Sequence, residues 1–321
     1  MKRKLFFRAD ASVQIGYGHF VRTLALAEMM KDYFECTFFT ANPSDSQIDE
    51  LKRVCSYVVL PENTKLDDFL SFLSGDEIVV LDNYFFTSDY QRRIKEKGCK
   101  LITFGTNDRH YYADVLINYA ESDSTIFDAE NYTQFKLGID WVILRKEFRF
   151  LHSISHPQTN RIVVCYGGTD QFCLTEKTVD VIQGLALPYN VDVVASERFG
   201  KERLEKLHQK GVCCHVNASA SEMVDLFGKC DCLISSASTI AHEGLACRLP
   251  VLCGYYVDNQ KRMYDYFISE NLVVGLSNML SDSFESLLSD SLINIEKYKS
   301  KIRPFKYGDV KQRYYSLFTS L

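Results

Sequence analysis

Residues 4–30 read KLFFRADASVQIGYGHFVRTLALAEMM: an apolar strand, a loop with two glycines, then a helix. The helical part carries Phe20, Leu24, Ala27 and Met30 at spacings of three and four residues, which places them on one face. A strand, a glycine-bearing turn and a helix form the repeating unit of parallel sheets that are covered by helices. This stretch therefore predicts an α/β fold.

The alternation of strand and helix signals extends along most of the chain. In the first half we expect strands near residues 4–8, 35–40, 56–60, 77–82, 100–104 and 114–118. In the second half we expect them near 161–166, 190–195, 211–216, 231–235, 251–255 and 272–275. Open parallel sheets bind ligands at the carboxyl ends of their strands, so the loops that follow the strands are where we expect function.

The length of the chain, 321 residues, predicts two domains. The alternation is interrupted at 145–160 by the polar, irregular segment RKEFRFLHSISHPQTN, which we interpret as a linker. We therefore expect an N-terminal domain over residues 1–150 and a C-terminal domain over residues 157–305.

Composition excludes several classes of protein. The net charge of -5 and the pI near 5.9 argue against a broad nucleic-acid surface. The start MKRKLFFR contains an apolar run too short for a signal peptide or a membrane span, so we expect no membrane association and a cytoplasmic location. Eleven cysteines are then expected to stay reduced.

The nearest approach to a metal-binding pattern is the run 213–215, Cys-Cys-His, followed by Cys230 and Cys232. It lacks a pair of C-x-x-C or H-x-x-x-H elements, so we interpret these residues as sheet interior and expect no metal and no cofactor. The chain also contains no D-x-D element of the kind that holds a divalent cation.

The first strand-to-helix loop carries the clearest catalytic signal. Gly16 and Gly18 allow a ligand to approach the backbone, and the helix start offers an anion site. A dinucleotide fingerprint would need a glycine where Val21 stands, so NAD binding is disfavoured. His19 opens the helix, where the positive end of the helix dipole favours a neutral imidazole that can act as a general base. Asp10 lies nearby in the same loop.

Polar residues also follow two further predicted strands. Residues 82–84, Asp-Asn-Tyr, end a buried-looking strand, although strands often end in such caps. Residues 167–170, Gly-Gly-Thr-Asp, precede a helix in the second half and repeat the logic of the first loop, although a plain turn could use the same glycines.

The loop after the strand near 231–235 suits a nucleotide diphosphate. This helix start carries small side chains that can donate hydrogen bonds, namely those of Ser236, Ser238 and Thr239. Glu243 follows about one turn later, roughly 5–6 Å along the helix, a suitable reach from a phosphate to ribose hydroxyls. The alternative is a capping run followed by a solvated glutamate.

Taken together, these motifs resemble a known family. The pattern R-A-D-A-S-x-x-I-G-x-G-H-x-x-R at 8–22, L-D-N-Y at 81–84, G-G-T-D at 167–170, S-A-S-T-x-x-x-E at 236–243 and N-Q at 259–260 is similar to the UDP-2,4-diacetamido-2,4,6-trideoxy-β-L-altropyranose hydrolases of bacterial pseudaminic acid synthesis. The last two motifs also resemble the UDP-GlcNAc transferase of peptidoglycan synthesis. That wider resemblance implies the GT-B fold, two Rossmann-like domains with parallel sheets facing a central cleft, and a final helix within 306–321 that returns to the first domain.

The resemblance also implies roles for individual residues. His19 would activate the attacking water, Tyr84 would line the reaction centre and Asn259 would contact the sugar. Substrate or UDP binding is expected for a further set of residues within the motifs, namely Asp10, Gly16, Gly18, Arg22, Gly167, Gly168, Ser236, Ser238, Thr239, Glu243 and Gln260. The chain departs from the family pattern at Cys173, where Asn is expected, and at 104–108, where a more acidic segment is usual.

The sequence thus predicts an enzyme that releases the diacetamido sugar from UDP by attack of water at the anomeric carbon. A UDP-sugar-dependent glycosyltransferase of the same fold is the main alternative, and a non-catalytic nucleotide-sugar-binding protein is the second. No nucleic-acid partner is expected.

Overall fold

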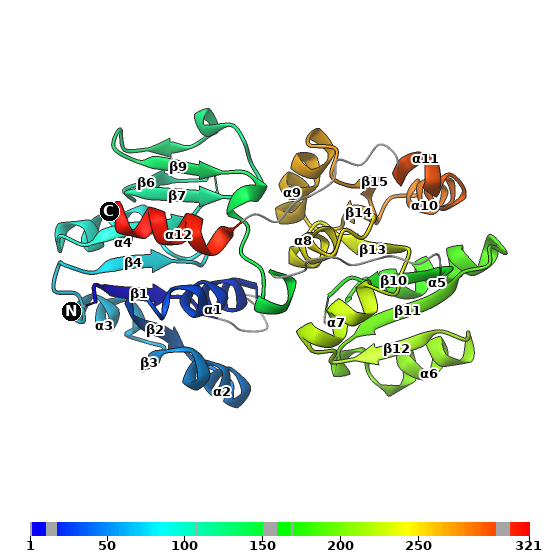
Figure 1. The fold of residues 1–321 in the computed structure, drawn as a ribbon, viewed down its shortest axis with the longest axis horizontal. Coiled ribbons are helices and arrows are strands. Elements are labelled where there is room, and N and C mark those ends of the chain that lie inside the picture. Colours follow the sequence, from blue (N-terminus) through cyan, green and yellow to red (C-terminus); the bar gives the residue numbers. More distant parts are fainter. Residues whose placement is uncertain (1, 11–17, 107, 150–158, 168–169, 300–308) are drawn as a thin grey trace. The chain divides into compact units, whose positions relative to one another are not determined.

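The computed structural model describes residues 2–10, 18–106, 108–149, 159–167, 170–299 and 309–321. The chain divides into two compact units (Figure 1). The first comprises Met1–Arg145 and Gly308–Leu321, and the second comprises Lys146–Tyr307. In the described parts of the chain, no helix combines the length and the apolar character that crossing a membrane requires.

The first unit is built on a seven-stranded sheet in the order β3-β2-β1-β4-β5-β7-β9, with every neighbouring pair parallel. Its strands are β1 (Lys4–Arg8), β2 (Glu35–Ala41), β3 (Ser56–Leu60), β4 (Ile78–Leu81), β5 (Lys100–Phe104), β7 (Val115–Asn118) and β9 (Gln134–Leu137). The helices are α1 (Gly18–Met30), α2 (Asp45–Val54), α3 (Lys65–Ser71) and α4 (Ser88–Glu96). Short strands β6 (His110–Tyr111) and β8 (Asp128–Ala129) form a separate pair.

Both faces of this sheet are covered, as the apolar runs in its strands require. One apolar cluster joins Phe39 and Val79 of the sheet to Phe69 of α3 and Ile94 of α4. On α1, the ring of Phe20 packs edge-on against Phe38 of β2, with centroids 5.2 Å apart. Capping fixes the neighbouring helix starts: the Ser44 hydroxyl accepts from the Gln47 amide at α2 in a capping box.

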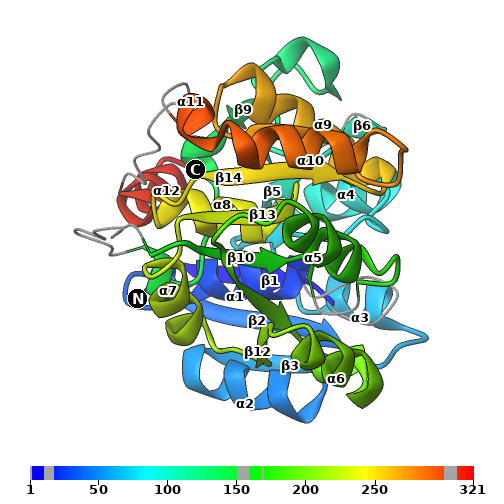
Figure 2. The same ribbon diagram turned by 90° about the vertical axis from the view of Figure 1, so that its right-hand side faces the viewer.

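The second unit contains a six-stranded parallel sheet in the order β12-β11-β10-β13-β14-β15, the strand order of a Rossmann fold. Its strands are β10 (Arg161–Cys165), β11 (Asn190–Ala195), β12 (Cys213–Val216), β13 (Cys232–Ser236), β14 (Val251–Tyr255) and β15 (Val274–Asn278). Its helices are α5 (Leu174–Gly184), α6 (Lys201–Gln209), α7 (Ala220–Phe227), α8 (Thr239–Ala246), α9 (Asp258–Ser269), α10 (Phe284–Ile293) and α11 (Ile295–Lys299). Figure 2 shows α5, α6 and α10 on the side of the sheet nearer the viewer, where their apolar residues share one core cluster with the strands.

The α/β class with two parallel sheets is confirmed, with local corrections. The strand expected at 272–275 begins later, at Val274, and runs to Asn278. Strand β9 was not predicted, because its sequence QFKL is too short and too polar to give a strand signal. Cys213 is exposed rather than interior, because β12 is the edge strand of its sheet. Residues 150–158 of the expected linker lie outside the described residues.

The C-terminal helix α12 (Val310–Thr319) belongs to the first unit. The Tyr314 hydroxyl donates to the Trp141 carbonyl at 2.8 Å, and the Phe318 ring stands edge-on to Phe34 with centroids 5.9 Å apart. Figure 1 shows this helix in red against that unit. A final helix within residues 306–321 was expected from the resemblance.

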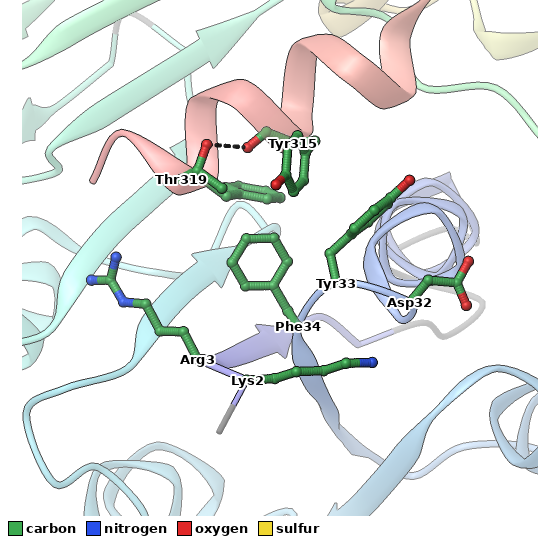
Figure 3. A pocket seen from close by; sticks show the side chains of 8 residues that line it. Lys2, Arg3, Asp32, Tyr33, Phe34, Tyr315 and Thr319 are labelled. Carbon is green, nitrogen blue, oxygen red and sulfur yellow. Dashed lines mark hydrogen bonds between the residues drawn. The ribbon is translucent and has the colours of Figure 1, made fainter.

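A surface pocket of about 520 Å³ lies where α12 meets the starts of β1 and β2 (Figure 3). Figure 3 shows the Phe34 ring directed toward the helix face that carries Tyr315 and Thr319. Lys2 and Asp32 also line the pocket. None of the predicted site residues lines it, so we assign it no part in the chemistry.

Gly244 sets the packing of α8 on its sheet. A Cβ at this position would lie 2.6 Å from Leu233 Cδ2 and 3.1 Å from Val251 Cγ2. Replacing Gly by Ala within an exposed helix is normally stabilising, but here the overpacking term dominates. We expect Gly244→Ala to lower the free energy of unfolding by about 1–3 kcal/mol in urea titrations.

The matched control is Gly184→Ala at the end of α5, where a Cβ would meet nothing within 4 Å. This substitution should leave the urea midpoint unchanged or raise it slightly. Equal destabilisation by both substitutions would contradict the packing argument.

Candidate active site

The buried carboxylate of Asp82 organises the site of the first unit. Asp82 follows β4 directly, and its side chain is 1% exposed. It accepts hydrogen bonds from His19 Nδ1 at 2.7 Å, from Thr23 Oγ1 at 2.9 Å and from the guanidinium of Arg22. All three donors lie on α1 at positions i, i+3 and i+4, which share one helix face. The turn of α1 that begins the helix is therefore tied to the end of β4.

The charges around Asp82 decide its protonation state. Burial raises the pKa of this carboxyl, but the Arg22 guanidinium and the His19 ring outweigh burial and lower it to about 2. The group is therefore ionised at neutral pH and can only accept hydrogen bonds. A hydrogen bond from His19 Nδ1 to this carboxylate requires a hydrogen on Nδ1, and it leaves the lone pair of a neutral ring on Nε2. Arg22 Nη2 lies 3.0 Å from the same His19 nitrogen, and in this tautomer it donates to Asp82 instead. This is the arrangement that orients a histidine as a general base.

Tyr84 stands beside this histidine. Its ring meets the His19 ring edge-on, with centroids 4.5 Å apart and planes at 89°, and it is 53% exposed. The Tyr84 carbonyl accepts from Arg109 Nη1 at 3.0 Å, and the Phe86 carbonyl accepts from the same nitrogen at 2.6 Å. Asp108, within the segment that departs from the family pattern, pairs with Arg109 at 2.7 Å. That segment therefore helps to hold the Tyr84 loop.

Two predicted ligand residues of this unit are engaged by the protein itself. Arg22 bonds Asp82 and Tyr119, and its guanidinium carbon lies 4.9 Å from the ring centroid of Phe104. Asp10 pairs with Arg8 and, at 3.2 Å, with Lys65.

Asp10 also fixes the backbone around it. It accepts from the Ala41 amide at 2.7 Å, while its own amide donates to Asn83 Oδ1 at 2.7 Å. Gly18 begins α1, and Gly16 lies outside the described residues.

In the second unit, the start of α5 is already occupied by an anion of the chain. Gly167 has a φ of 91°, and Gly168 lies outside the described residues. The Asp170 carboxylate accepts from the amides of Leu174 and Thr175, each at 2.9 Å, and pairs with Arg203 at 3.0 Å. Two amides at this helix start, which were expected to bind a phosphate, thus already donate to the Asp170 carboxylate.

Cys173, which departs from the family pattern, precedes α5 with a φ of 52°. This is the left-handed region, which Asn adopts more readily than other side chains. The left-handed conformation explains why the family has Asn at this position. Cys173 adopts the same conformation at a cost in backbone strain.

The start of α8 differs from that of α5. Ser238 is its N-cap but makes no side-chain cap, because its hydroxyl donates to the Ser236 carbonyl at 3.2 Å. Thr239 is the first helical residue, and the Glu243 side chain one turn later is almost fully buried. The side chain of the capping residue therefore covers none of the first-turn amides of α8, which suits an anion site.

The N-Q pair lies at the start of α9. Gln260 Nε2 donates to Ser236 Oγ at 3.4 Å, and Gln260 Oε1 accepts from the Tyr256 amide at 3.1 Å. Asn259 is exposed on the same turn. Within this unit the structure brings Gln260 to the serine loop of α8.

The sequence did not place Asp82, Tyr119 or Arg109 in the site. Asp82 gave a weak signal as a polar strand end, but nothing local showed its partner, because His19 lies 63 residues earlier. Tyr119 and Arg109 gave no signal of their own.

Comparisons with known proteins first define a class. The fold matches MurG of Acinetobacter baumannii with a TM-score of 0.67 over 99% of this chain and 100% of that one, at 9% identity. It matches HepE of Anabaena in complex with UDP and glucose with a TM-score of 0.64 over 99% and 100%, at 10% identity. The chain therefore has the GT-B fold of the glycosyltransferases.

Sequence relatives are more specific. The chain is 27% identical over 80% of its length, and 93% of the relative's, to the UDP-2,4-diacetamido-2,4,6-trideoxy-β-L-altropyranose hydrolase of Campylobacter jejuni. It is 23% identical to the spore coat polysaccharide biosynthesis protein SpsG of Bacillus subtilis over 94% of this chain and 91% of that one. It is 26% identical to an uncharacterized protein of Methanocaldococcus jannaschii over 83% of this chain, but it spans only 58% of that protein. No family model matches the chain.

The ionised state of Asp82 predicts a pH-dependent contribution to stability. Replacement by Asn should lower the free energy of unfolding by about 3–5 kcal/mol at pH 7, because Arg22 loses its buried counter-ion. The folded pKa is depressed from 3.8 to about 2, so this contribution is complete above pH 4 or so and is lost as pH falls through about 2. Urea unfolding at a series of pH values measures it.

Asp89→Asn, at a carboxylate that is 64% exposed on α4, is the matched control. It should change stability by less than about 1 kcal/mol. A difference between wild type and Asp82→Asn that stays constant down to pH 2 or so would refute the assignment.

Proposed function

We propose that this chain hydrolyses a UDP-activated sugar, with His19 as the base that deprotonates the attacking water. The observation that carries the proposal is the 2.7 Å contact between His19 Nδ1 and the buried, ionised Asp82. A protein that only binds a sugar nucleotide does not need a histidine whose proton-accepting nitrogen is oriented by a buried carboxylate.

The proton and electron movements follow from this pair. His19 Nε2 takes a proton from water as the water oxygen bonds to the anomeric carbon on the face opposite UDP. The bond from that carbon to the phosphate oxygen breaks, and its electron pair leaves with UDP. Asp82 stabilises the imidazolium that forms, and Arg22 keeps Asp82 ionised so that the proton remains on the ring. The product has the inverted anomeric configuration.

The second unit would hold the UDP. The start of α8 would bind the diphosphate through the amides of Ser238 and Thr239, which are not covered by a side-chain cap. Glu243 would accept from the ribose hydroxyls. Gln260 would support the serine loop, and Asn259 would contact the sugar. The α5 start would contribute less than its glycines suggest, because Asp170 already occupies it.

The substrate class rests on the relatives. The Campylobacter jejuni hydrolase is named for a UDP-2,4-diacetamido-trideoxy sugar, and the chain resembles it over most of both lengths. We therefore propose the altropyranose derivative as the substrate. The alternative, transfer of the sugar to an acceptor, is supported by the GT-B fold that the chain shares with UDP-glucosyltransferases.

Product analysis without any acceptor separates these functions. The protein should release UDP and the free sugar from the altropyranose derivative, and UDP-GlcNAc serves as the comparison substrate. His19→Asn should lower kcat by roughly 10²- to 10⁴-fold while leaving UDP affinity unchanged, because only the proton transfer is lost.

His208→Asn, at an exposed histidine of α6, is the matched control and should keep full activity. UDP release only after an acceptor is added would establish a transferase. Full activity of His19→Asn would remove the proposed base.

The proposed role of Glu243 is tested by comparing UDP with 2′-deoxy-UDP in calorimetric titrations. The wild-type protein should bind UDP roughly 10- to 100-fold more tightly, because a hydroxyl that donates to a carboxylate contributes more than a neutral hydrogen bond. Glu243→Gln should weaken this preference while diphosphate binding persists. An unchanged preference would place the ribose elsewhere.

A further inference from the structure

A second cluster of reactive side chains lies in the second unit on the outer strands of its sheet. It consists of Asp192 on β11 and Cys213 and His215 on β12. One ligand atom from each residue lies within 4.8 Å of the other two. Asp192 pairs in register with Cys213, and Val194 pairs with His215.

Strand alternation explains why these three side chains meet. Residues 213 and 215 are two apart on one strand, so they project from the same face as the in-register Asp192. Cys214 projects from the opposite face, where it packs against the apolar core of the unit. The two adjacent cysteines thus have different surroundings.

One contact in the cluster has the spacing of two ligands in a tetrahedral site, and the other is a hydrogen bond that a metal ion would have to open. Cys213 Sγ lies 3.6 Å from His215 Nε2, and ligand atoms about 2.0–2.3 Å from a zinc ion are roughly 3.3–3.8 Å apart. His215 Nε2 lies 2.7 Å from Asp192 Oδ1. A metal ion would replace the proton shared by those two atoms, and the pair would have to separate by less than about 1 Å.

The carboxylate of Asp192 is held in place from behind. Its side chain is 1% exposed, and Arg161 Nη2 donates to Oδ1 at 2.7 Å and to Oδ2 at 2.8 Å. Metal-ligating carboxylates commonly have such a second partner. The guanidinium also repels a cation, so the affinity should be lower than that of a site without Arg161.

The edge of the sheet leaves one side open. Cys213 is exposed and the His215 side chain is 33% exposed, so an ion and a water molecule can reach the cluster. Sulfur, imidazole nitrogen and carboxylate oxygen together form a ligand set that favours Zn²⁺ over Mg²⁺ or Ca²⁺.

We infer that Asp192, Cys213 and His215 form a binding site for a zinc-like divalent cation, with water as the fourth ligand. Binding joins β12 to β11 and releases the thiol proton of Cys213. Cys213 and His215 lie on β12, the outermost strand, whereas the serine loop and α8 follow β13, from which β12 is separated by β11 and β10. The site therefore acts on the stability of the edge strand and not on the proposed hydrolysis.

Cobalt(II) is the probe for this site. The reduced, chelator-treated full-length protein is titrated with Co²⁺ and read by absorption spectroscopy. We expect saturation at one ion per chain, with thiolate-to-cobalt charge transfer in the near ultraviolet and the strong visible bands of tetrahedral Co²⁺. Cys213→Ser should abolish the charge-transfer band, and His215→Ala should weaken Co²⁺ binding by at least about 10-fold.

Cys214→Ser is the matched control and should bind Co²⁺ as the wild-type protein does. Zn²⁺ should displace Co²⁺ and raise the Tm of wild type and Cys214→Ser, but not of Cys213→Ser. The chain has eleven cysteines, so binding at other thiols would be seen as a band that survives in Cys213→Ser. That result, or the absence of a band in the wild-type protein, would overturn the inference.

Discussion

The contact of the Asp82 carboxylate with the face of α1 is the interaction on which the proposed site of the first unit depends. The Asp82 carboxylate is 1% exposed, so charges and hydrogen bonds must offset the cost of removing it from water. Among the described residues, the side chains that donate to it all come from α1. The same bonds hold α1 at one rotation over the end of β4 and assign the His19 hydrogen to Nδ1. Folding of this unit therefore also orients the histidine that we propose as a general base.

The starts of two helices in the second unit differ in whether a side chain of the protein accepts hydrogen bonds from their amides. Both α5 and α8 follow a parallel strand, and the first four amides of a helix have no partner within the helix. At α5, Asp170 adopts a φ of 36° and its carboxylate returns to the amides of the helix. At α8, the Ser238 hydroxyl donates to the Ser236 carbonyl instead. A bound anion gains more at the second helix start, because it does not have to displace a carboxylate.

The outer strands of the second sheet show how an edge can carry chemistry of its own. In the interior of the sheet, Cys232 and Cys253 are buried small side chains, and burial raises the pKa of the Cys253 thiol. On the edge strand β12, Cys213 has one neighbouring strand and faces solvent on the other side. The same residue type is thus a packing element in the centre of the sheet and a candidate ligand at its rim.

Local pattern in the sequence determined the alternation of strands and helices, the α/β class, the first helix from about His19 and the residues at the ends of the main strands. These features depend on neighbours a few residues apart, so spacing alone reveals them. Tertiary structure decided that Asp82 orients His19 and that Asp170 accepts from the amides at the start of α5. It also decided that Asp192 lies in register with Cys213 on the neighbouring strand. The partner of Asp82, His19, is 63 residues away, and the partner of Asp192 on the next strand, His215, is 23 residues away. The contact of Asp170 depends on its left-handed backbone conformation. No local periodicity in the sequence encodes any of these three features.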